Sequence, residues 1–230
     1  MFQGGICSWA GNGGTMNTEA REHLSELADK FSSVIPEVDA DAEHDRWQPG
    51  IGPFEEENQI QMILDALEGR PIRNMIETEV PYLQGKQRCD LVLDCPGLRL
   101  PVEAKLLRFR YDNGNIDPNS FARIFTPFPE RRSSSMLTDT KKLYESEFES
   151  NGGVLGLYYE KTDEDYKQMT AEAIAEKFCI DVEFWFDFHS LLHLQYQFAG
   201  RGRVASIQAT EQKMYQIDVQ FADTNVRRKS

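Results

Sequence analysis

The chain has 230 residues, of which 40% are hydrophobic and 27% charged, and its formal net charge is −13. This length suffices for one domain with a sizeable core, or for a domain with an appendage. No apolar run approaches the roughly 18 residues of a membrane-spanning helix, and the N-terminus lacks the basic and apolar regions of a signal peptide.

The cysteines carry no pattern of a metal site. Cys7, Cys89, Cys95 and Cys179 are scattered along the chain and form no Cys-x-x-Cys motif. This spacing disfavours a zinc site and a disulfide framework, and it makes free thiols in a reducing compartment the default. We therefore expect a cytoplasmic protein with no membrane association.

The negative charge is unevenly distributed along the chain. Residues 1–69 carry 14 acidic and 3 basic side chains, residues 143–200 carry 12 and 3, and residues 99–142 carry 5 and 9. A polyanion could be drawn to the basic segment, while the acidic segments suit a protein partner. The alternative is that all of these segments are ordinary solvated faces.

Two helices are predicted in the first third of the chain. Residues 1–17 are rich in Gly and Asn and predict a flexible arm, and residues 18–34 then place apolar side chains at helical spacing. Residues 36–53 form an acidic linker rich in Pro and Asp. The second helix begins with acids, ends at Gly69 and carries an apolar stripe of Ile60, Ile63, Leu64 and Leu67.

The most informative segment follows a strand predicted over residues 76–82. Two short apolar runs, joined by a Pro-Gly turn, span residues 88–106. Side chains of a strand alternate between faces, so Glu103 and Lys105 share one face. If the two runs pair as a hairpin, Asp90 comes close to both. Two carboxylates and one ammonium group that converge in this way suit a divalent cation and a phosphodiester.

Two less specific explanations compete with such a site. The three charged residues could form an ordinary cross-strand ion pair on a solvated face. The apolar residues 91–93 and 100–102 argue against this, because they predict buried strands, in which a charged side chain is costly unless it has a specific role. Asp94 shares the face of Asp90, but an acid beside a Pro-Gly turn more often fixes the backbone geometry.

A long loop is predicted over about residues 109–132. Loops of this length are uncommon unless they are functional or mobile. Arginines and phenylalanines in and beside this loop resemble a surface that contacts phosphates and bases, although arginines are common in loops of all kinds. The candidate DNA-binding residues are Arg108, Arg110, Arg123, Arg131 and Arg132.

The last part of the chain returns to regular structure. A helix over residues 133–148, a buried strand over residues 154–159 and a helix over residues 168–178 are predicted. Apolar side chains then alternate as in a strand, at Val182, Phe184, Phe186 and Phe188. Residues 204–209 and 214–221 predict a closing hairpin. This order of elements predicts an α/β fold, with a mixed sheet between helices.

The order helix, strand, strand, strand, helix, strand resembles the restriction-endonuclease-like fold of the PD-(D/E)xK nuclease superfamily. The resemblance covers roughly residues 54–160 and rests on Asp90 of the second strand and on the Glu-x-Lys of Glu103 and Lys105 on the third. Cys89 stands where the family name has proline, which is often absent in the superfamily.

Two helices add to the resemblance. The helix after the Glu-x-Lys strand carries Asp139 and Lys142. The leading helix should supply an acid, for which Glu57 is the first choice, because it precedes the apolar stripe by three residues at Ile60. Glu56, four residues before Ile60, is the second choice.

The resemblance implies metal-dependent hydrolysis of phosphodiester bonds. Asp90 and Glu103 would hold Mg²⁺, or Mn²⁺ as a substitute, with the backbone carbonyl of Ala104 as a further ligand. Lys105 would position the attacking water or stabilise the transition state, and Glu57 would hold a water or a second metal. The implied catalytic residues are Asp90, Glu103, Lys105 and Glu57.

We therefore expect an α-β-β-β-α-β nuclease core over residues 54–160. Residues 1–53 would form an arm, a helix and an acidic linker, and residues 161–230 an extension of the same domain that ends in a β-hairpin. The expected function is a Mg²⁺-dependent DNA endonuclease of restriction, defence or repair type. A cut through both strands would favour a homodimer. The alternatives are a catalytically silent binding or regulatory module on the same fold, and an RNA-directed nuclease.

Overall fold

The computed structural model describes most of the central part of the chain. The described residues are 18–47, 49–82, 86–109, 115, 117, 119, 124–127, 134–146, 151–159, 171–185, 193–199, 202–209 and 215–224. The helices are α1 (Thr18–Asp41), α2 (Glu56–Ala66), the 3₁₀ helix η1 (Pro71–Met75), α4 (Met136–Glu145) and α5 (Ala171–Trp185). The strands are β1 (Ile76–Pro81), β2 (Arg88–Cys95), β3 (Leu98–Leu107), β4 (Asn151–Tyr159), β5 (His193–Ala199), β6 (Gly202–Ala209) and β7 (Tyr215–Thr224).

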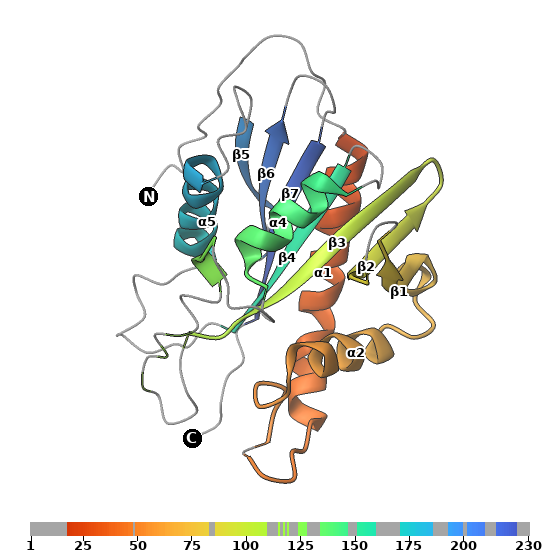
Figure 1. Ribbon diagram of the computed structural model, residues 1–230. Helices are drawn as coiled ribbons and strands as arrows, with labels where there is room; N and C mark the ends of the chain where they lie inside the picture. Colours follow the sequence, from red (N-terminus) through yellow and green to blue (C-terminus); the bar gives the residue numbers. More distant parts are fainter. Residues whose placement is uncertain are drawn as a thin grey trace, which may run out of the picture.

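The described strands form one mixed sheet in the order β1-β2-β3-β4-β7-β6-β5. β1, β2 and β3 are antiparallel neighbours, and β4 runs parallel to β3 on one side and to β7 on the other. β7, β6 and β5 are again antiparallel. In Figure 1, α4 lies across the near face of the sheet and α1 runs behind it, with α2 crossing α1. The α/β class and the mixed sheet agree with the sequence prediction.

The two faces of β3 have different surroundings. Leu98, Leu100, Val102 and Ala104 point into the main apolar core, to which α1 and α2 also contribute. The intervening residues point to the opposite face, where α4 lies. On the core side α1 packs so closely on β4 that a Cβ at Gly153 would lie 2.9 Å from the side chain of Leu24. The sheet therefore separates an apolar core from a charged face.

The first helix is longer than the sequence predicted. A helix ending at residue 34 and a following linker were expected, whereas α1 continues through Pro36 to Asp41. A proline inside a helix costs about 3 kcal/mol, because it removes a backbone hydrogen bond and clashes with the preceding turn. Ile35 and Val38 lie in the buried core on the continued stripe. Their burial offsets that cost.

The strand predicted from Val182 onward is wrong for the described residues. α5 extends to Trp185 and includes Val182 and Phe184. Ile174, Phe178 and Val182 are buried at a spacing of four residues, whereas Phe184 is 73% exposed. A helical stripe therefore explains the burial better than alternation does. Phe186 and Phe188 lie outside the described residues.

The other elements lie within a few residues of their predicted positions. β6 and β7 form the antiparallel pair that was predicted, and β5 is an additional strand that was not. Cys89 and Cys95 are buried free thiols. Among the described helices none has the length and apolar character needed to cross a bilayer. Most of the loop predicted over residues 109–132 lies outside the described residues.

Candidate active site

Asp90 lies where the pairing between β2 and β3 ends. The last pair of the register is Leu91 with Val102, so Asp90 and Glu103 follow one residue beyond it. There the carboxylate of Asp90 takes the place of a strand partner, because its Oδ2 accepts a hydrogen bond of 2.7 Å from the backbone N–H of Ala104. This contact holds Asp90 at the backbone between Glu103 and Lys105.

The other neighbour of Asp90 is also irregular. The residues directly before and after Asp90 are paired with residues of β1. The residue of β1 opposite Asp90 is therefore Glu79. Glu79 is the one described non-glycine residue with a positive φ, of 52°. Such a conformation costs about 1–3 kcal/mol and requires support from its surroundings. A hollow of about 270 Å³ opens beside Asp90, lined also by Glu56, Glu57, Ile60, Gln61, Thr78 and Glu79.

Glu103 is buried, and both of its carboxylate oxygens have partners. The side chain is on the face of β3 that α4 covers, and the residue is 2% exposed. The hydroxyl of Tyr82 donates a hydrogen bond to Oε1, and Nζ of Lys142 lies 2.8 Å from Oε2. Burial, and then the charge of Asp90, raise the pKa of Glu103, while the ammonium of Lys142 opposes this shift.

Lys105 lies between two acids that come from different helices. Its Nζ is 3.2 Å from Oε1 of Glu56 and 3.4 Å from Oδ2 of Asp139. Burial favours the neutral amine, but the carboxylates of Asp139, Glu56 and Asp90 outweigh it and raise the pKa of Lys105. Lys105 therefore remains an ammonium ion at neutral pH.

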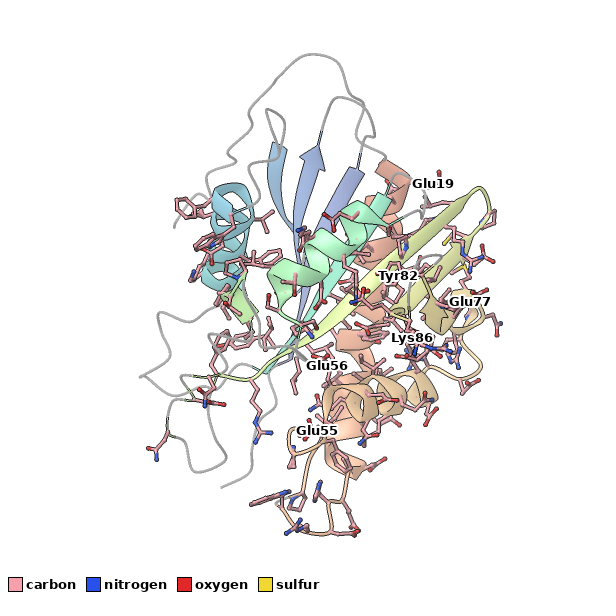
Figure 2. The ribbon with its side chains drawn as sticks, in the orientation of Figure 1. Glu19, Glu55, Glu56, Glu77, Tyr82 and Lys86 are labelled. Carbon is pink, nitrogen blue, oxygen red and sulfur yellow. The ribbon has the colours of Figure 1, made fainter. Side chains whose placement is uncertain are left out.

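The structure distinguishes between the two candidate acids of the leading helix. Glu56 reaches β3, where it contacts Lys105 and also accepts a hydrogen bond from the backbone N–H of Leu106. Figure 2 shows Glu56 beside the strands, with Glu55 further from the sheet. Burial raises the pKa of Glu56, and Lys105 opposes the rise. Glu57, the first choice from the sequence, is exposed and lines the hollow instead.

Two residues of α4 join the site. Ser135 caps this helix, with its side chain accepting from the N–H of Thr138, and this places Asp139 in the first turn. Asp139 and Lys142, three residues apart, share one face of the helix, and their side chains are 3.7 Å apart. The sequence identified both only as a pattern on the following helix; the available signal was an acid and a base at helical spacing after the Glu-x-Lys strand.

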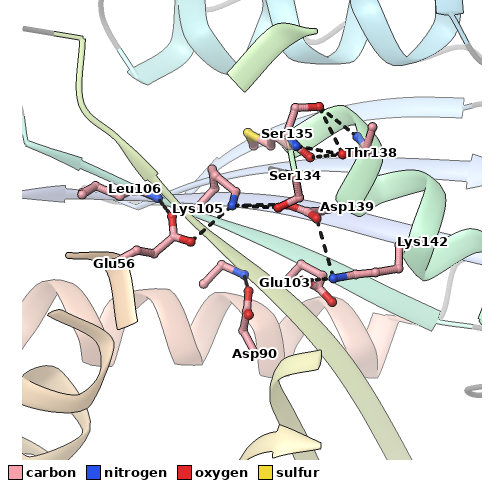
Figure 3. A network of polar contacts seen from close by, with 12 residues as sticks. Glu56, Asp90, Glu103, Lys105, Leu106, Ser134, Ser135, Thr138, Asp139 and Lys142 are labelled. Atoms are coloured by element: carbon pink, nitrogen blue, oxygen red, sulfur yellow. Dashed lines mark hydrogen bonds and ion pairs between the residues drawn. The ribbon is translucent and has the colours of Figure 1, made fainter. Parts of the chain in front are cut away.

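Together these side chains form what we call the charge cluster, shown in Figure 3. Its members are Glu56, Asp90, Glu103, Asp139, Lys105 and Lys142. With every group ionised, four carboxylates face two ammonium groups, an excess of two negative charges. Burial is the main reason that the pKa values of Glu56, Asp90 and Glu103 are raised. A bound divalent cation would balance this excess.

The donor set of the charge cluster fits Mg²⁺. Mg²⁺ prefers oxygen ligands, keeps several waters and uses only one or two protein carboxylates. Asp90 and Glu103 are two such carboxylates, and Oδ1 of Asp90 accepts no hydrogen bond from the described residues. In the same part of the chain no three His, Cys, Asp or Glu side chains are grouped as metal ligands. The ligands would therefore be two carboxylates and mostly water.

The predicted DNA-contacting surface is described only in part. Arg108 is half-buried, and its Nη1 donates to the carbonyl of Gly52 at 3.3 Å. The other four arginines proposed for this surface lie outside the described residues: Arg110, Arg123, Arg131 and Arg132. Asp94, the alternative acid of β2, is exposed beside the turn that follows it.

Comparisons of the chain with protein-family models, with curated proteins and with solved structures gave no match.

Proposed function

We propose that the protein hydrolyses phosphodiester bonds in a Mg²⁺-dependent reaction, and that DNA is its substrate. The observation that carries the proposal is that half-buried Asp90 and buried Glu103 lie beside Lys105, in a cluster with an excess of carboxylates over ammonium groups. The order α2-β1-β2-β3-α4-β4 supports a restriction-endonuclease-like core, as the sequence resemblance implies.

The two carboxylates would supply most of the protein ligands. Asp90 and Glu103, with the carbonyl of Ala104, would hold Mg²⁺, which lowers the pKa of bound water and neutralises charge on phosphate oxygens. The hydrogen bond from the N–H of Ala104 fixes the orientation of the Asp90 carboxylate. Tyr82 fixes that of Glu103 in the same way. Carboxylates that are already oriented need little rotation of their own when the metal binds.

Lys105 acts as a fixed positive charge. Because the neighbouring carboxylates raise its pKa, Lys105 carries a proton at neutral pH. Its ammonium group would stabilise the negative charge that develops on the phosphate. Glu56 and Asp139 hold this group from two sides, at 3.2 Å and 3.4 Å. In this proposal Glu56, rather than Glu57, is the acid of the leading helix.

Plasmid cleavage tests the proposal. The wild type should nick or cut DNA in Mg²⁺ or Mn²⁺ and should be inactive in EDTA. Asp90→Asn, Glu103→Gln and Lys105→Ala should each lower the rate by at least about 100-fold, because each removes a charge that acts on the transition state. Equal residual cleavage by the wild type and Glu103→Gln would exclude the assignment.

Asp94→Asn is the matched control for Asp90→Asn. Both substitutions remove one carboxylate charge from β2, but Asp94 is exposed and lies outside the charge cluster. Its cleavage rate should therefore equal that of the wild type. Duplex DNA and single-stranded RNA offered side by side decide which nucleic acid is cut.

One observation favours a second candidate, a binding or regulatory module without catalysis. Both oxygens of Glu103 are engaged by Tyr82 and Lys142, so the site is partly neutralised by the protein itself. Calorimetric titration with Mn²⁺ separates the two functions. Binding that is lost in Glu103→Gln supports the nuclease, and no binding supports the module.

A further inference from the structure

Lys142 occupies the position on Glu103 where a metal ion would bind. Its Nζ lies 2.8 Å from Oε2 of Glu103 and 5.3 Å from the centre of the Tyr82 ring. The side chain is only 20% exposed, and Glu103 is 2% exposed. Tyr82 covers the other oxygen of the same carboxylate. Both oxygens therefore already have a partner, and a cation that binds Oε2 would come close to the ammonium group of Lys142.

An ammonium ion and a divalent cation cannot share one buried carboxylate without strong repulsion. Like charges about 4 Å apart repel by several kcal/mol where water is largely excluded. The neutral hydroxyl of Tyr82 has no such conflict with a cation. Of the two partners of Glu103, Lys142 is thus the one that a metal ion displaces.

We propose that Lys142 is an internal counter-ion, which balances the ionised carboxylate of Glu103 in the metal-free protein and which Mg²⁺ or Mn²⁺ displaces. This inference rests on the metal-dependent function proposed above and adds a regulatory element to that site. Metal binding is weakened by the free energy that is needed to separate Lys142 from Glu103.

Asp139 provides the position to which Lys142 moves. Its Oδ1 is already 3.7 Å from Nζ of Lys142, and the two residues lie on the same helix face. Asp139 is 2% exposed, and its other oxygen contacts Lys105 at 3.4 Å. After displacement Lys142 would remain paired with Asp139. Two ammonium groups, from Lys105 and Lys142, would then face an incoming phosphodiester.

Calorimetric titration with Mn²⁺ tests this inference, with folding checked by circular dichroism. The variants are Lys142→Gln, Lys142→Met and, as control, Lys141→Gln. Lys141 is the neighbouring residue of α4, half-exposed, and pairs only with Glu145 among the described residues, at 3.6 Å. The two glutamine variants change the net charge equally, so a difference between them reports the position and not the total charge. The titration is run at pH 8.5, where protons compete least for Glu103.

We expect Lys142→Gln and Lys142→Met to bind Mn²⁺ on the order of tenfold more tightly than the wild type, because a positive charge next to the site is gone. Lys141→Gln should bind like the wild type. Without metal, the Lys142 variants should melt at a lower temperature than the wild type, because the Glu103 carboxylate is left buried and without its ammonium partner. Mn²⁺ should then raise the melting temperature of the Lys142 variants by more than it raises that of the wild type.

The possible results separate this inference from the proposed function. Equal or weaker binding in the Lys142 variants, with binding in the wild type, overturns the counter-ion and leaves the nuclease intact. Absence of binding in every protein overturns both. Binding in both Lys142 variants, with none in the wild type or in Lys141→Gln, supports the counter-ion strongly.

Amine labelling of the wild type followed by mass spectrometry tests the displacement without any substitution. Mn²⁺ should increase the labelling rate of Lys142, which leaves its contact with Glu103, and not that of Lys141. An unchanged rate at Lys142 under saturating Mn²⁺ overturns the displacement even if the variants do not fold.

Discussion

Glu56 and Glu57 are neighbours in the sequence, but their side chains have different surroundings. Successive residues of a helix are 100° apart, and the buried positions of α2 are Gln59, Ile60, Ile63 and Leu64. Glu56 lies close to the centre of this stripe, and Glu57 lies roughly 90° from it. Glu56 can therefore reach Lys105, and Glu57 faces solvent at the rim of the hollow.

Alanine substitutions of these two acids should have different effects on stability. Glu56→Ala leaves the N–H of Leu106 and one side of the buried Lys105 without an acceptor, and should lower the free energy of unfolding by about 1–3 kcal/mol. Glu57→Ala should change it by no more than about 0.5 kcal/mol, because the residue is exposed. Urea denaturation of both variants measures the difference. Equal losses would contradict the placement of Glu56.

The same residues show which parts of the site follow from the sequence. Asp90, Glu103 and Lys105 are close because strands alternate and a short turn joins β2 to β3, and both signals are local. The contact of Lys105 with Glu56 joins residues 49 positions apart. The preference for Glu57 followed from its spacing to Ile60 and Leu64 alone; the whole buried stripe, which also includes Ile63 and the polar Gln59, is centred nearer to Glu56.

At the scale of elements, α4 connects the sheet to the charge cluster. A capping box at Ser135 and Thr138 starts the helix, and Asp139 and Lys142 follow within the next two turns. Ser135 is fully buried, and its hydroxyl also donates to the carbonyl of Thr126. The start of α4 is thus fixed from two directions, and its position determines where both charged side chains lie.

Ser135→Ala should weaken this start. Loss of the cap removes the acceptor of the Thr138 N–H and the hydrogen bond to the carbonyl of Thr126, and should lower the free energy of unfolding by about 0.5–2 kcal/mol. Ser33→Ala is the control, since Ser33 is an exposed serine within α1 and caps no helix end. Chemical denaturation of the two variants compares them. A loss in Ser33→Ala as large as in Ser135→Ala would show that the cap contributes nothing specific.

Elements were predicted well where local patterns and packing agree. β2 and β3 are bounded by a turn and have clear apolar runs, and the sequence placed both within a few residues. α1 continued past Pro36, because tertiary burial of Ile35 and Val38 outweighs a local helix breaker. α5 replaced a strand for a similar reason: of the two described residues of that alternation, Val182 is buried and Phe184 is exposed, which a helix accommodates.

At the scale of the whole molecule, the four carboxylates and two ammonium groups of the charge cluster account for two of the negative charges in the formal net charge of −13. With all groups ionised, the charge cluster is therefore negative, as the whole chain is. Burial comes first among the causes that raise the pKa values of Glu56, Asp90 and Glu103, so all three shift in the same direction. Their ionisation opposes folding, and stability should depend on pH.

Glu103 defines the pH range of this effect. Burial and the charge of Asp90 raise the pKa of Glu103 from its usual 4.5 to about 8. Between these values the folded protein holds a proton that the unfolded chain has lost. The resulting stabilisation is fully present below the lower value and is lost as the pH rises through the higher one. The free energy of unfolding, measured by urea denaturation in metal-free buffer, should therefore fall from about pH 5 to about pH 8.

Two comparisons isolate the part of this slope that belongs to the site. Glu103→Gln removes the titrating group and should flatten the decline, whereas Asp94→Asn, at an exposed position of the neighbouring strand β2, should leave it unchanged. Saturating Mg²⁺ should also flatten it, because a divalent cation favours the ionised carboxylate and replaces the proton. If the free energy of unfolding falls as steeply in Glu103→Gln as in the wild type, the decline comes from the general acidity of the chain. If Mg²⁺ leaves the decline unchanged, a metal at Glu103 is contradicted.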